Sequence, residues 1–530
     1  MNKPQQLLIG IVISTLGCII ILFYLLYTHT RAEEPKATIF SLPVPSLLSP
    51  AQPQIGSYQG TFNTAPSVTH HLKILNASFL HNAMRNYYGD SAPSQLEVIW
   101  KHKLGHGTTR IGKETKIWRG AGWTGQPLLV EENGKKYLIQ GAYDHHLKKI
   151  DAETGKLIWQ YQFDDVIKGT GTIWLNPLAD SLKHFCIILQ GSRAGKSNYA
   201  TTIPSYRAIS YFTGEELWSL NSVKTASYSR DVDASALIVR DTAYIGLENS
   251  IFTVLDPNPS KASFRNKLLQ PKIYNNSDTL YLPKDIVAHG GNLVTEASPA
   301  LLHNHIYIAS GSGHIWGYNL ATHAIDWDYW VGSDIDGSPV VTIDNCLLIS
   351  IEKQYIKGQG GLLKLNPSKA PQQAVEWFFP TQNKPFSTWE GGIIGSSSVN
   401  YYYKAPKQPN IAAFTAIDGF LYVVDTDQLA SFTTTTTYDS SHYFPAPKLL
   451  FKQYIGPSIS TPIIVQNKII AASYKGIYLF EFDKDMNFKL KTKVKIRCES
   501  TPVVDHGRVY IASRNGYLYC LGEKDPPINN

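Results

Sequence analysis

The sequence predicts an all-β protein: a single eight-bladed β-propeller of four-stranded blades, preceded by one transmembrane helix and a linker. Three observations support this fold class. A pattern of short strands recurs eight times after Gly122, turns within it carry Thr-Gly followed by Trp, and one long uncharged stretch lies near the N-terminus. The 31 Tyr and 11 Trp also favour β structure, because these residues suit pleated surfaces.

Each repeat has the same internal order. A Gly or an acid leads into Ser/Thr-Pro and a β-branched run, an apolar second strand follows, and an alternating third strand comes next. Successive Pro positions are 40 to 64 residues apart. About 40 residues make one four-stranded propeller blade, so the longer repeats contain inserted loops. The Pro position, or the residue that replaces it, falls at Pro127, Pro177, Ala236, Pro299, Pro339, Ser398, Pro462 and Pro502.

The stretch IDAETGKLIWQ, Ile150–Gln160, shows how a repeat ends, and ISYFTGEELWS at 209–219 repeats it. Thr-Gly is predicted to turn the chain between the third and fourth strands, since Gly adopts the positive φ that such hairpins require. The Trp that follows is predicted to cover the seam to the next blade, a packing role that suits a large flat ring better than a cofactor role. The predicted blade-docking residues are Trp100, Trp159, Trp218, Trp327 and Trp377.

The eighth repeat stops without a fourth strand of its own. Upstream of the first repeat, Gln95–Gly105 (QLEVIWKHKLG) reads as a fourth strand that has no repeat before it, and it carries Trp100. We therefore expect this segment to pair with the last blade and close the ring. Closure removes exposed sheet edges.

With these motifs the repeats from Gln95 to Glu523 resemble the pyrroloquinoline-quinone-type propeller repeats. Two families share such repeats: the quinoprotein alcohol dehydrogenases, and the non-catalytic propeller lipoprotein that assists outer-membrane protein assembly. The chain is closer in character to the second. The Thr-Gly-x-x-x-Trp signature is structural, so the resemblance implies the fold and leaves the function open.

The resemblance to the dehydrogenases implies a quinone held near a disulfide of two adjacent cysteines, with Ca²⁺ and an Asp base beside it. Here the cysteines are Cys18, Cys186, Cys346, Cys498 and Cys520, and none of them are neighbours. We interpret the last four as buried thiols, with one structural disulfide among them as the alternative. No catalytic residue is predicted and no cofactor is expected. The alternative is a divergent quinoprotein oxidoreductase of alcohols or sugars, with pyrroloquinoline quinone and Ca²⁺.

One set of polar residues is a candidate binding site. Three residues before the Pro position, four first strands carry Asp233, Glu296, Asp336 and Glu499. First strands line a propeller's central channel, so these carboxylates are expected at one channel mouth. They suit either a pocket for a cation, metal or polar ligand, or hydrogen bonds to backbone N–H groups that hold the blades together. Other charged residues expected near the same mouth are Arg119, Arg230, His289, Glu390 and Arg497.

The N-terminal part is predicted to tether the ring to a membrane. Leu7–Tyr27 has no charge across 21 residues, and a helix of that length spans roughly 31 Å, the thickness of a bilayer core. The sequence TLGC at 15–18 faintly resembles a lipoprotein cleavage box, but its order is wrong and the apolar run continues beyond Cys18. The expected organisation is a stub and anchor at 1–30, a Pro/Ser-rich linker at 31–92 that contains a short helix within 71–88, the propeller at 93–525 and a tail at 526–530.

Charge and organisation favour a binding function. The net charge is +7, but no long basic block is present, so nucleic acid is not an expected partner. We expect a single-pass protein with its propeller outside the cytoplasm, in the cell envelope or periplasm, acting as a binding or scaffold module for protein partners there. We expect no catalysis, with the quinoprotein enzyme as the alternative.

Overall fold

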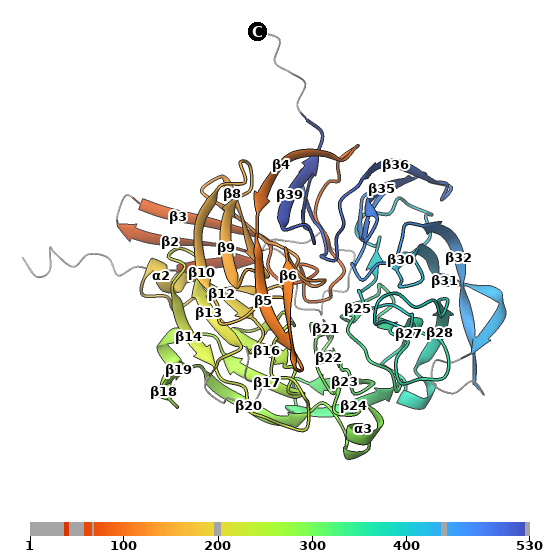
Figure 1. Cartoon of the computed structure of the whole chain (residues 1–530), viewed down its shortest axis with the longest axis horizontal. Helices are drawn as coiled ribbons and strands as arrows, with labels where there is room; N and C mark the ends of the chain where they lie inside the picture. Colours follow the sequence, from red (N-terminus) through yellow and green to blue (C-terminus); the bar gives the residue numbers. More distant parts are fainter. Residues whose placement is uncertain (1–36, 42–57, 66–67, 195–202, 436–441, 525–530) are drawn as a thin grey trace, which may run out of the picture.

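The computed structural model places eight blades of four antiparallel strands each around one axis (Figure 1). The structure describes the chain except for residues 1–36, 42–57, 66–67, 195–202, 436–441 and 525–530. Within the described part, the predicted eight-bladed propeller is confirmed. Among these residues no helix is long and apolar enough to span a bilayer, and the predicted anchor, Leu7–Tyr27, lies outside them, as does the predicted tail.

Each blade consists of a short first strand next to the axis and longer strands outside it. The first four blades comprise β7 (Leu128–Glu132), β8 (Lys135–Gly141), β9 (His146–Asp151) and β10 (Leu157–Gln162); β11 (Thr172–Leu175), β12 (Cys186–Gly191), β13 (Tyr206–Ser210) and β14 (Glu216–Leu220); β15 (Leu237–Val239), β16 (Thr242–Gly246), β17 (Ile251–Asp256) and β20 (Lys272–Thr279); and β21 (Ala300–Leu302), β22 (His305–Ala309), β23 (His314–Asn319) and β24 (Ala324–Trp330).

The last four blades repeat this order, and the final one takes its outer strand from the N-terminal side of the chain. They comprise β25 (Val340–Val341), β26 (Leu347–Ile351), β27 (Gly361–Leu365) and β28 (Val375–Pro380); β29 (Ser398–Val399), β30 (Ile411–Thr415), β31 (Phe420–Thr435) and β32 (Tyr443–Tyr454); β33 (Ile463–Val465), β34 (Lys468–Ser473), β35 (Gly476–Phe482) and β36 (Phe488–Val494); and β37 (Val503–Asp505), β38 (Arg508–Ala512), β39 (Tyr517–Gly522) and β4 (Glu97–Lys103).

The ring closes as predicted, through β4. This strand pairs antiparallel with β39, and Trp100 lies opposite Cys520 in the register. The remaining elements are insertions: the hairpins β5 (His106–Ile111) with β6 (Glu114–Arg119) and β18 (Ser263–Arg265) with β19 (Leu268–Gln270), and the short helices α2 (Leu182–Phe185), α3 (Pro283–Ala288), Pro259–Lys261 and Pro371–Gln373.

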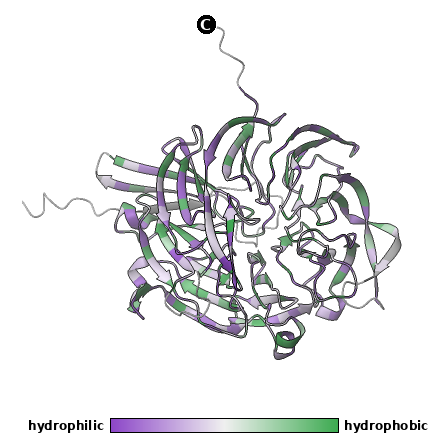
Figure 2. Ribbon diagram, in the orientation of Figure 1, coloured by the Kyte–Doolittle hydropathy of each residue, from purple (hydrophilic) through white to green (hydrophobic). Residues whose placement is uncertain are grey.

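Each seam between neighbouring blades buries an apolar cluster, and apolar and polar residues alternate along many of the strands (Figure 2). The predicted tryptophans lie at these seams, and each donates its indole N–H to a backbone carbonyl of the following blade. Gly155 and Gly214 of the Thr-Gly turns have φ of 70° and 71° and lie against the rings of Trp100 and Trp159. The donor–acceptor distances are Trp100 to Ala152 3.1 Å, Trp159 to Tyr211 2.9 Å, Trp218 to Pro257 2.9 Å, Trp327 to Lys369 3.1 Å and Trp377 to Thr426 3.0 Å.

A second set of contacts joins the blades near the axis. A Ser or Thr one or two residues before the Pro position accepts a hydrogen bond from the backbone N–H of the equivalent residue in the preceding blade. These contacts form a hydroxyl belt from the third blade to the eighth. These N–H groups are buried, and a buried donor without a partner is costly. The belt runs from Ser235 N to Ser298 Oγ (2.9 Å), Ser298 N to Ser338 Oγ (2.8 Å), Ser338 N to Ser396 Oγ (2.8 Å), Ser396 N to Thr461 Oγ1 (2.8 Å) and Thr461 N to Thr501 Oγ1 (3.4 Å).

The segment before β4 differs from the prediction. The short helix expected within 71–88 is wrong: β3 (Val68–Asn76) continues to Asn76, and no helix follows in the described residues up to β4. Leu72 and Ile74 are buried while their neighbours are more exposed, so the spacing of the apolar residues is that of a strand. β1 (Ala37–Ser41), β2 (Tyr58–Ala65) and β3 extend the first sheet beyond β7.

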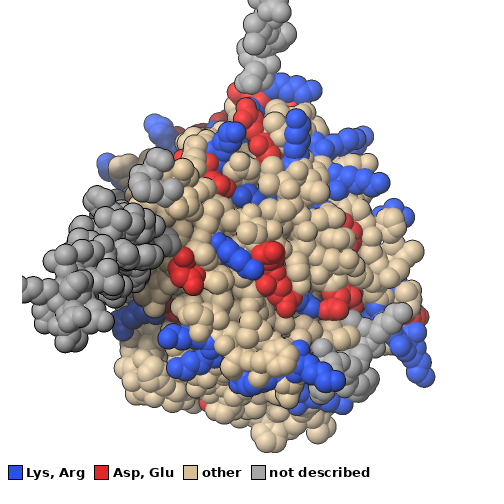
Figure 3. Space-filling model, turned by 90° about the vertical axis from the view of Figure 1, so that its left-hand side faces the viewer, with Lys and Arg blue, Asp and Glu red and all other residues tan. Residues whose placement is uncertain are grey.

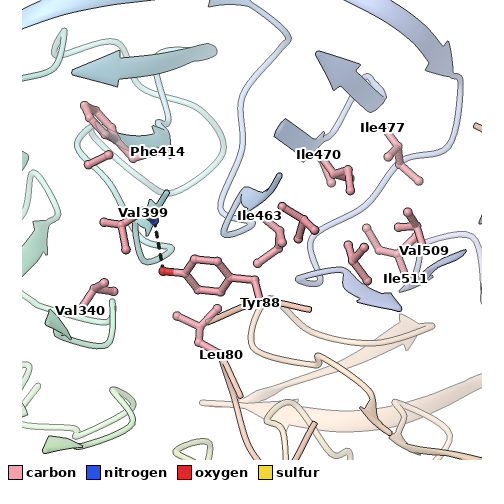
Figure 4. Packing of buried hydrophobic residues seen from close by; sticks show 14 of the residues in the cluster. Leu80, Tyr88, Val340, Val399, Phe414, Ile463, Ile470, Ile477, Val509 and Ile511 are labelled. Atoms are coloured by element: carbon pink, nitrogen blue, oxygen red, sulfur yellow. Dashed lines mark hydrogen bonds between the residues drawn. The ribbon is translucent and has the colours of Figure 1, made fainter. Parts of the chain in front are cut away.

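Residues 77–92, the central plug, then cross the channel. The side chains of Leu80 and Tyr88 lie among apolar residues of several first strands, and Tyr88 Oη accepts a hydrogen bond from Val399 N at 3.2 Å (Figure 4). Arg85 is fully buried and donates to Pro299 O at 3.0 Å. Plug residues hydrogen-bond to every blade, through Gln126, Ile173, Ser235, Pro299, Val341, Val399, Gln466 and Gly507.

We expect Ser298→Ala to lower the free energy of unfolding by about 1–3 kcal/mol, because it leaves the buried N–H of Ser235 without an acceptor. Urea denaturation of the purified protein measures this change. Ser263→Ala, on the exposed strand β18, is the matched control and should lie within about 0.5 kcal/mol of the parent. Equal losses in both variants would show that the belt contributes nothing.

Removal of the plug should lower the stability of the fold far more than removal of the residues before Tyr58. A chain that begins at Tyr58 keeps the plug and should unfold cooperatively close to the parent's melting temperature. A chain that begins at Gln95 loses the buried side chains of Phe79, Leu80 and Tyr88. Loss of a buried aromatic side chain lowers the free energy of unfolding by about 3–5 kcal/mol. We expect this shorter chain to aggregate or to lose its cooperative transition in calorimetry. Matching transitions for the two chains would contradict the plug's role.

Candidate functional site

The predicted acidic positions precede the first strands, at the channel mouth that the plug does not fill. Three of the four carboxylates come together there: Asp233 precedes β15, Glu296 precedes β21 and Asp336 precedes β25, on three successive blades. All three are largely buried, and Asp233 and Asp336 both lie close enough to Glu296 to affect its pKa. The fourth, Glu499, lies elsewhere. The register of the repeat therefore predicted the convergence for three of these residues.

Lys168 lies at the centre of one half of this cluster. Its ammonium nitrogen is 2.5 Å from Asp233 Oδ2, 2.9 Å from Glu296 Oε1 and 3.4 Å from Glu248 Oε1. The residue is on the segment that leads into β11, on the blade before Asp233. A buried ammonium that touches three carboxylates neutralises only part of their charge.

Sequence reasoning missed four further acids of the same mouth. Asp231 and Asp334 stand two residues before predicted acids, in the segments DVD and DID, and Glu248 and Glu352 follow the second strands of their blades. The repeated Asp-x-Asp pattern was the available signal for the first pair. Together with Asp233, Glu296 and Asp336, these residues define the acidic mouth, which covers the third, fourth and fifth blades in the described part of the chain.

The two halves of the acidic mouth differ in their partners. In the first half, Arg193 pairs with Asp231 at 2.7 Å, next to the ion pairs of Lys168. In the second half, Asp334, Asp336 and Glu352 form no ion pair with any Lys or Arg among the described residues; Asn292 donates to Asp334 Oδ2 at 2.7 Å. Asp334 Oδ1 and Asn292 Oδ1 are buried there without a hydrogen-bond partner.

This difference in ion pairing between the two halves shifts the pKa values of the acids. Burial raises the pKa of Asp233 to about 7 against the opposing effect of Lys168, and burial with the charge of Glu296 raises the pKa of Asp334 to about 7. Burial also raises the pKa values of Asp336 and Glu352 well above their usual range, and nearby carboxylates add to this. Burial opposes the ionisation of Glu296 as well, but Lys168 and hydrogen bonds outweigh it and lower its pKa. Several of these groups therefore hold protons near neutral pH.

Glu499 and two of the predicted basic residues occupy the opposite side of the ring. Glu499 Oε1 is 3.2 Å from Arg514 Nε and accepts a hydrogen bond from the Tyr474 hydroxyl at 2.6 Å. The guanidinium of Arg497 lies over the Tyr474 ring, 4.7 Å from its centroid. Arg119 is exposed at the end of β6, and its carbonyl accepts from Arg514 at 3.3 Å.

The remaining predicted residues border the acidic mouth in different ways. Arg230 is buried, donates to Ser222 O at 2.7 Å and lies within electrostatic reach of Asp231. His289 stacks on Tyr355 with ring centroids 4.5 Å apart, which places Tyr355 at the rim of the acidic mouth. Glu390 is exposed, lies 3.7 Å from Lys353 Nζ and acts electrostatically on Glu352.

The interpretation of the acids as acceptors for interblade N–H groups is not what these contacts show. In the described part of the chain, Asp233, Glu296 and Asp336 accept no hydrogen bond from a backbone N–H, and the hydroxyl belt provides that connection. Asp233 and Glu296 join neighbouring blades through Lys168 instead, whereas Asp336 forms no ion pair with a Lys or Arg in the described part of the chain.

Comparison with known proteins places the fold. The family model of the outer membrane protein assembly factor BamB matches residues 95–288. A europium-containing methanol dehydrogenase is 11% identical, with 84% of this chain and 98% of that chain aligned and a TM-score of 0.52. BamB from Moraxella catarrhalis is 13% identical over 81% of this chain and 98% of that chain, with a TM-score of 0.48. No curated protein matches the sequence.

The family model covers residues 95–288, and the alignment with the methanol dehydrogenase at 11% identity supports a shared propeller architecture alone. A likeness of this kind carries no activity to this chain. Whether the residues of the channel mouth fit a cofactor has to be judged from their own geometry.

These residues do not fit the calcium–quinone pair of the PQQ-like dehydrogenases. Asp233, Glu248 and Glu296 offer oxygen atoms within 4.8 Å of one another, the spacing of a metal site, but Lys168 Nζ already contacts all three. The cysteines cannot supply the adjacent pair either: Cys186, Cys346, Cys498 and Cys520 are separate, buried free thiols. The predicted buried thiols are therefore confirmed.

The raised acid pKa values predict a loss of stability toward alkaline pH. A carboxyl whose pKa rises from about 4 in the unfolded chain to about 7 in the fold stabilises the fold below about pH 4. That contribution disappears as the pH rises through 7. Asp334→Asn removes it, so the variant should gain stability relative to the parent as the pH rises from about 5 to about 8.

Melting temperatures of the two proteins across that range measure the effect. Glu153→Gln, at an exposed turn, makes the same charge change outside the acidic mouth and should follow the parent. Parallel curves for Asp334→Asn and the parent would show that Asp334 ionises in the folded protein as it does in the unfolded chain.

Proposed function

We propose that this chain is a binding module of the cell envelope, which docks on a protein partner through exposed faces of its propeller and does no chemistry itself. The observation that carries the proposal is the acidic mouth: a rigid, preformed set of carboxylates on three blades, with an ammonium where a catalytic metal would lie. Such a site is suited to recognition of positive charge, because its acids need a cation to ionise.

Two further features support a binding role. The plug fills the channel on one side of the acids, so a ligand can approach from the other side only. On the face shown in Figure 3, acidic side chains lie among the basic ones, which is unlike the continuous basic surface of a nucleic-acid-binding protein. The proposed function includes a membrane tether: Leu7–Tyr27 would span the membrane and hold the propeller outside the cytoplasm.

Site-specific photo-crosslinking in cells tests this function. A photoreactive residue would replace one exposed side chain at a time: Tyr355 at the mouth, Leu178, or Phe264 on β18. We expect at least one position to give a discrete adduct with an envelope protein. The assay leaves the buried residues around Lys168 unchanged. Adducts from none of the positions would argue against a protein partner.

The enzyme alternative is tested on the purified chain with added quinone, Ca²⁺, an artificial electron acceptor and a panel of alcohols and sugars. We expect no turnover above the protein-free control. Turnover that requires both quinone and Ca²⁺, and that Glu296→Gln abolishes without loss of folding, would replace the binding function with a quinoprotein activity.

A further inference from the structure

The acidic mouth contains a second half that lacks the cation the first half has. Lys168 shows what the first half holds: an ammonium group that touches Asp233, Glu248 and Glu296. Asp334 and Asp336 lie beside this group and pair with no Lys or Arg among the described residues. The nearest basic neighbour in sequence, Lys353, is directed to Glu390 at 3.7 Å.

Side-chain oxygens without a hydrogen-bond partner also occur in this half, as they do at Asp233 in the first half. Asp334 is 5% exposed and Asn292 is 7% exposed, and each has a side-chain oxygen with no hydrogen-bond donor. A buried polar atom without a partner is costly, so two such oxygens side by side indicate a missing donor. A group that brings several N–H donors and a positive charge would satisfy both.

Aromatic rings complete the surroundings. Tyr228 is 59% exposed and Tyr355 is 46% exposed, although both lie within electrostatic reach of the acids. Burial, and then the charges of Glu296 and Asp334, raise the pKa of the Tyr228 phenol, and burial and Asp334 act in the same direction on Tyr355. Exposed tyrosine rings beside carboxylates suit an organic cation, since the ring face attracts ammonium and guanidinium groups.

A divalent metal suits this half less well. In the described part of the chain, three possible ligand atoms approach closely enough for a metal only at Asp233, Glu248 and Glu296, where Lys168 lies, and at a separate group of Asp90, Asp505 and His506. Asp334, Asp336 and Glu352 do not form such a trio. Guanidinium and ammonium groups, with several N–H donors each, bridge more widely spaced acceptors.

We propose that the second half of the acidic mouth binds an arginine or lysine side chain of a protein partner, seated between Asp334, Asp336 and Glu352 with Tyr228 and Tyr355 at its rim. This inference rests on the proposed binding function and names the chemistry of the docking segment. The bound cation ionises acids that are protonated in the free protein, so binding releases protons and strengthens as the pH rises from about 6 to about 8.

The test measures the binding of a fluorophore-labelled tetra-arginine peptide to the purified full chain by fluorescence anisotropy. We expect Asp334→Asn with Asp336→Asn to weaken binding by about tenfold or more, the usual effect of losing charged hydrogen bonds. The control pair, Glu153→Gln with Asp485→Asn, makes the same change in net charge at exposed positions and should bind within about twofold of the parent. Tyr355→Leu keeps the acids and should weaken binding about fivefold.

Four outcomes would overturn the inference. Equal losses in the mouth pair and the control pair would show unspecific attraction. Binding that weakens as the pH rises would contradict the ionisation of the acids. A melting shift with CaCl₂ alone that needs Asp334 and Asp336, without peptide binding, would make this half a metal site. If the peptide fails to bind while crosslinked partners persist, the cationic segment is wrong and the binding function stands.

Discussion

The hydroxyl belt is the constraint on which the centre of this molecule depends. Each first strand is short, its N–H groups are buried, and a Ser or Thr of the next blade is the acceptor at 2.8–3.4 Å in the contacts from Ser235 to Thr501. A larger or apolar residue at these positions would separate the strands or leave the donors unpaired. The belt thereby sets how close to the axis the first strands of the third to eighth blades begin.

Two consequences follow from this spacing, one at each end of the channel. Below the belt, a channel lined by first strands needs filling, and the plug supplies Leu80 and Tyr88 together with backbone groups for every blade (Figure 4). Above it, acids that precede adjacent first strands are brought close enough to affect one another's pKa, as with Glu296 and Asp336. The belt makes the ring stable enough to tolerate this crowding of carboxylates, which by itself opposes folding at neutral pH.

The sequence predicted what is local or periodic. Strand order, Thr-Gly turns and seam tryptophans repeat with the blade, so eight imperfect copies reinforce one another, and Gln95–Gly105 was recognisable because the last blade lacked a strand. Lys168 carries no such signal: its partner Glu296 is 128 residues away, and the contact exists only once the ring has closed. β3 was misread as part of a short helix because Leu72 and Ile74 fit a helix as well as a strand until the pairing with β7 is known.

The position of Lys168 bears most directly on what kind of protein this is. A PQQ-like propeller that uses a metal needs carboxylates left open at the mouth, whereas here an internal ammonium occupies the one group of oxygens close enough together in the described channel. Conversion to a metal site would require this side chain to leave and three buried acids to lose their cation first. Asp334 and Asp336 have no such ammonium group beside them, and burial raises their pKa values. A partner's basic side chain would bring a positive charge to the second half, as Lys168 does in the first. The ion pairs of Lys168 are therefore the same kind of interaction as the one proposed for the partner.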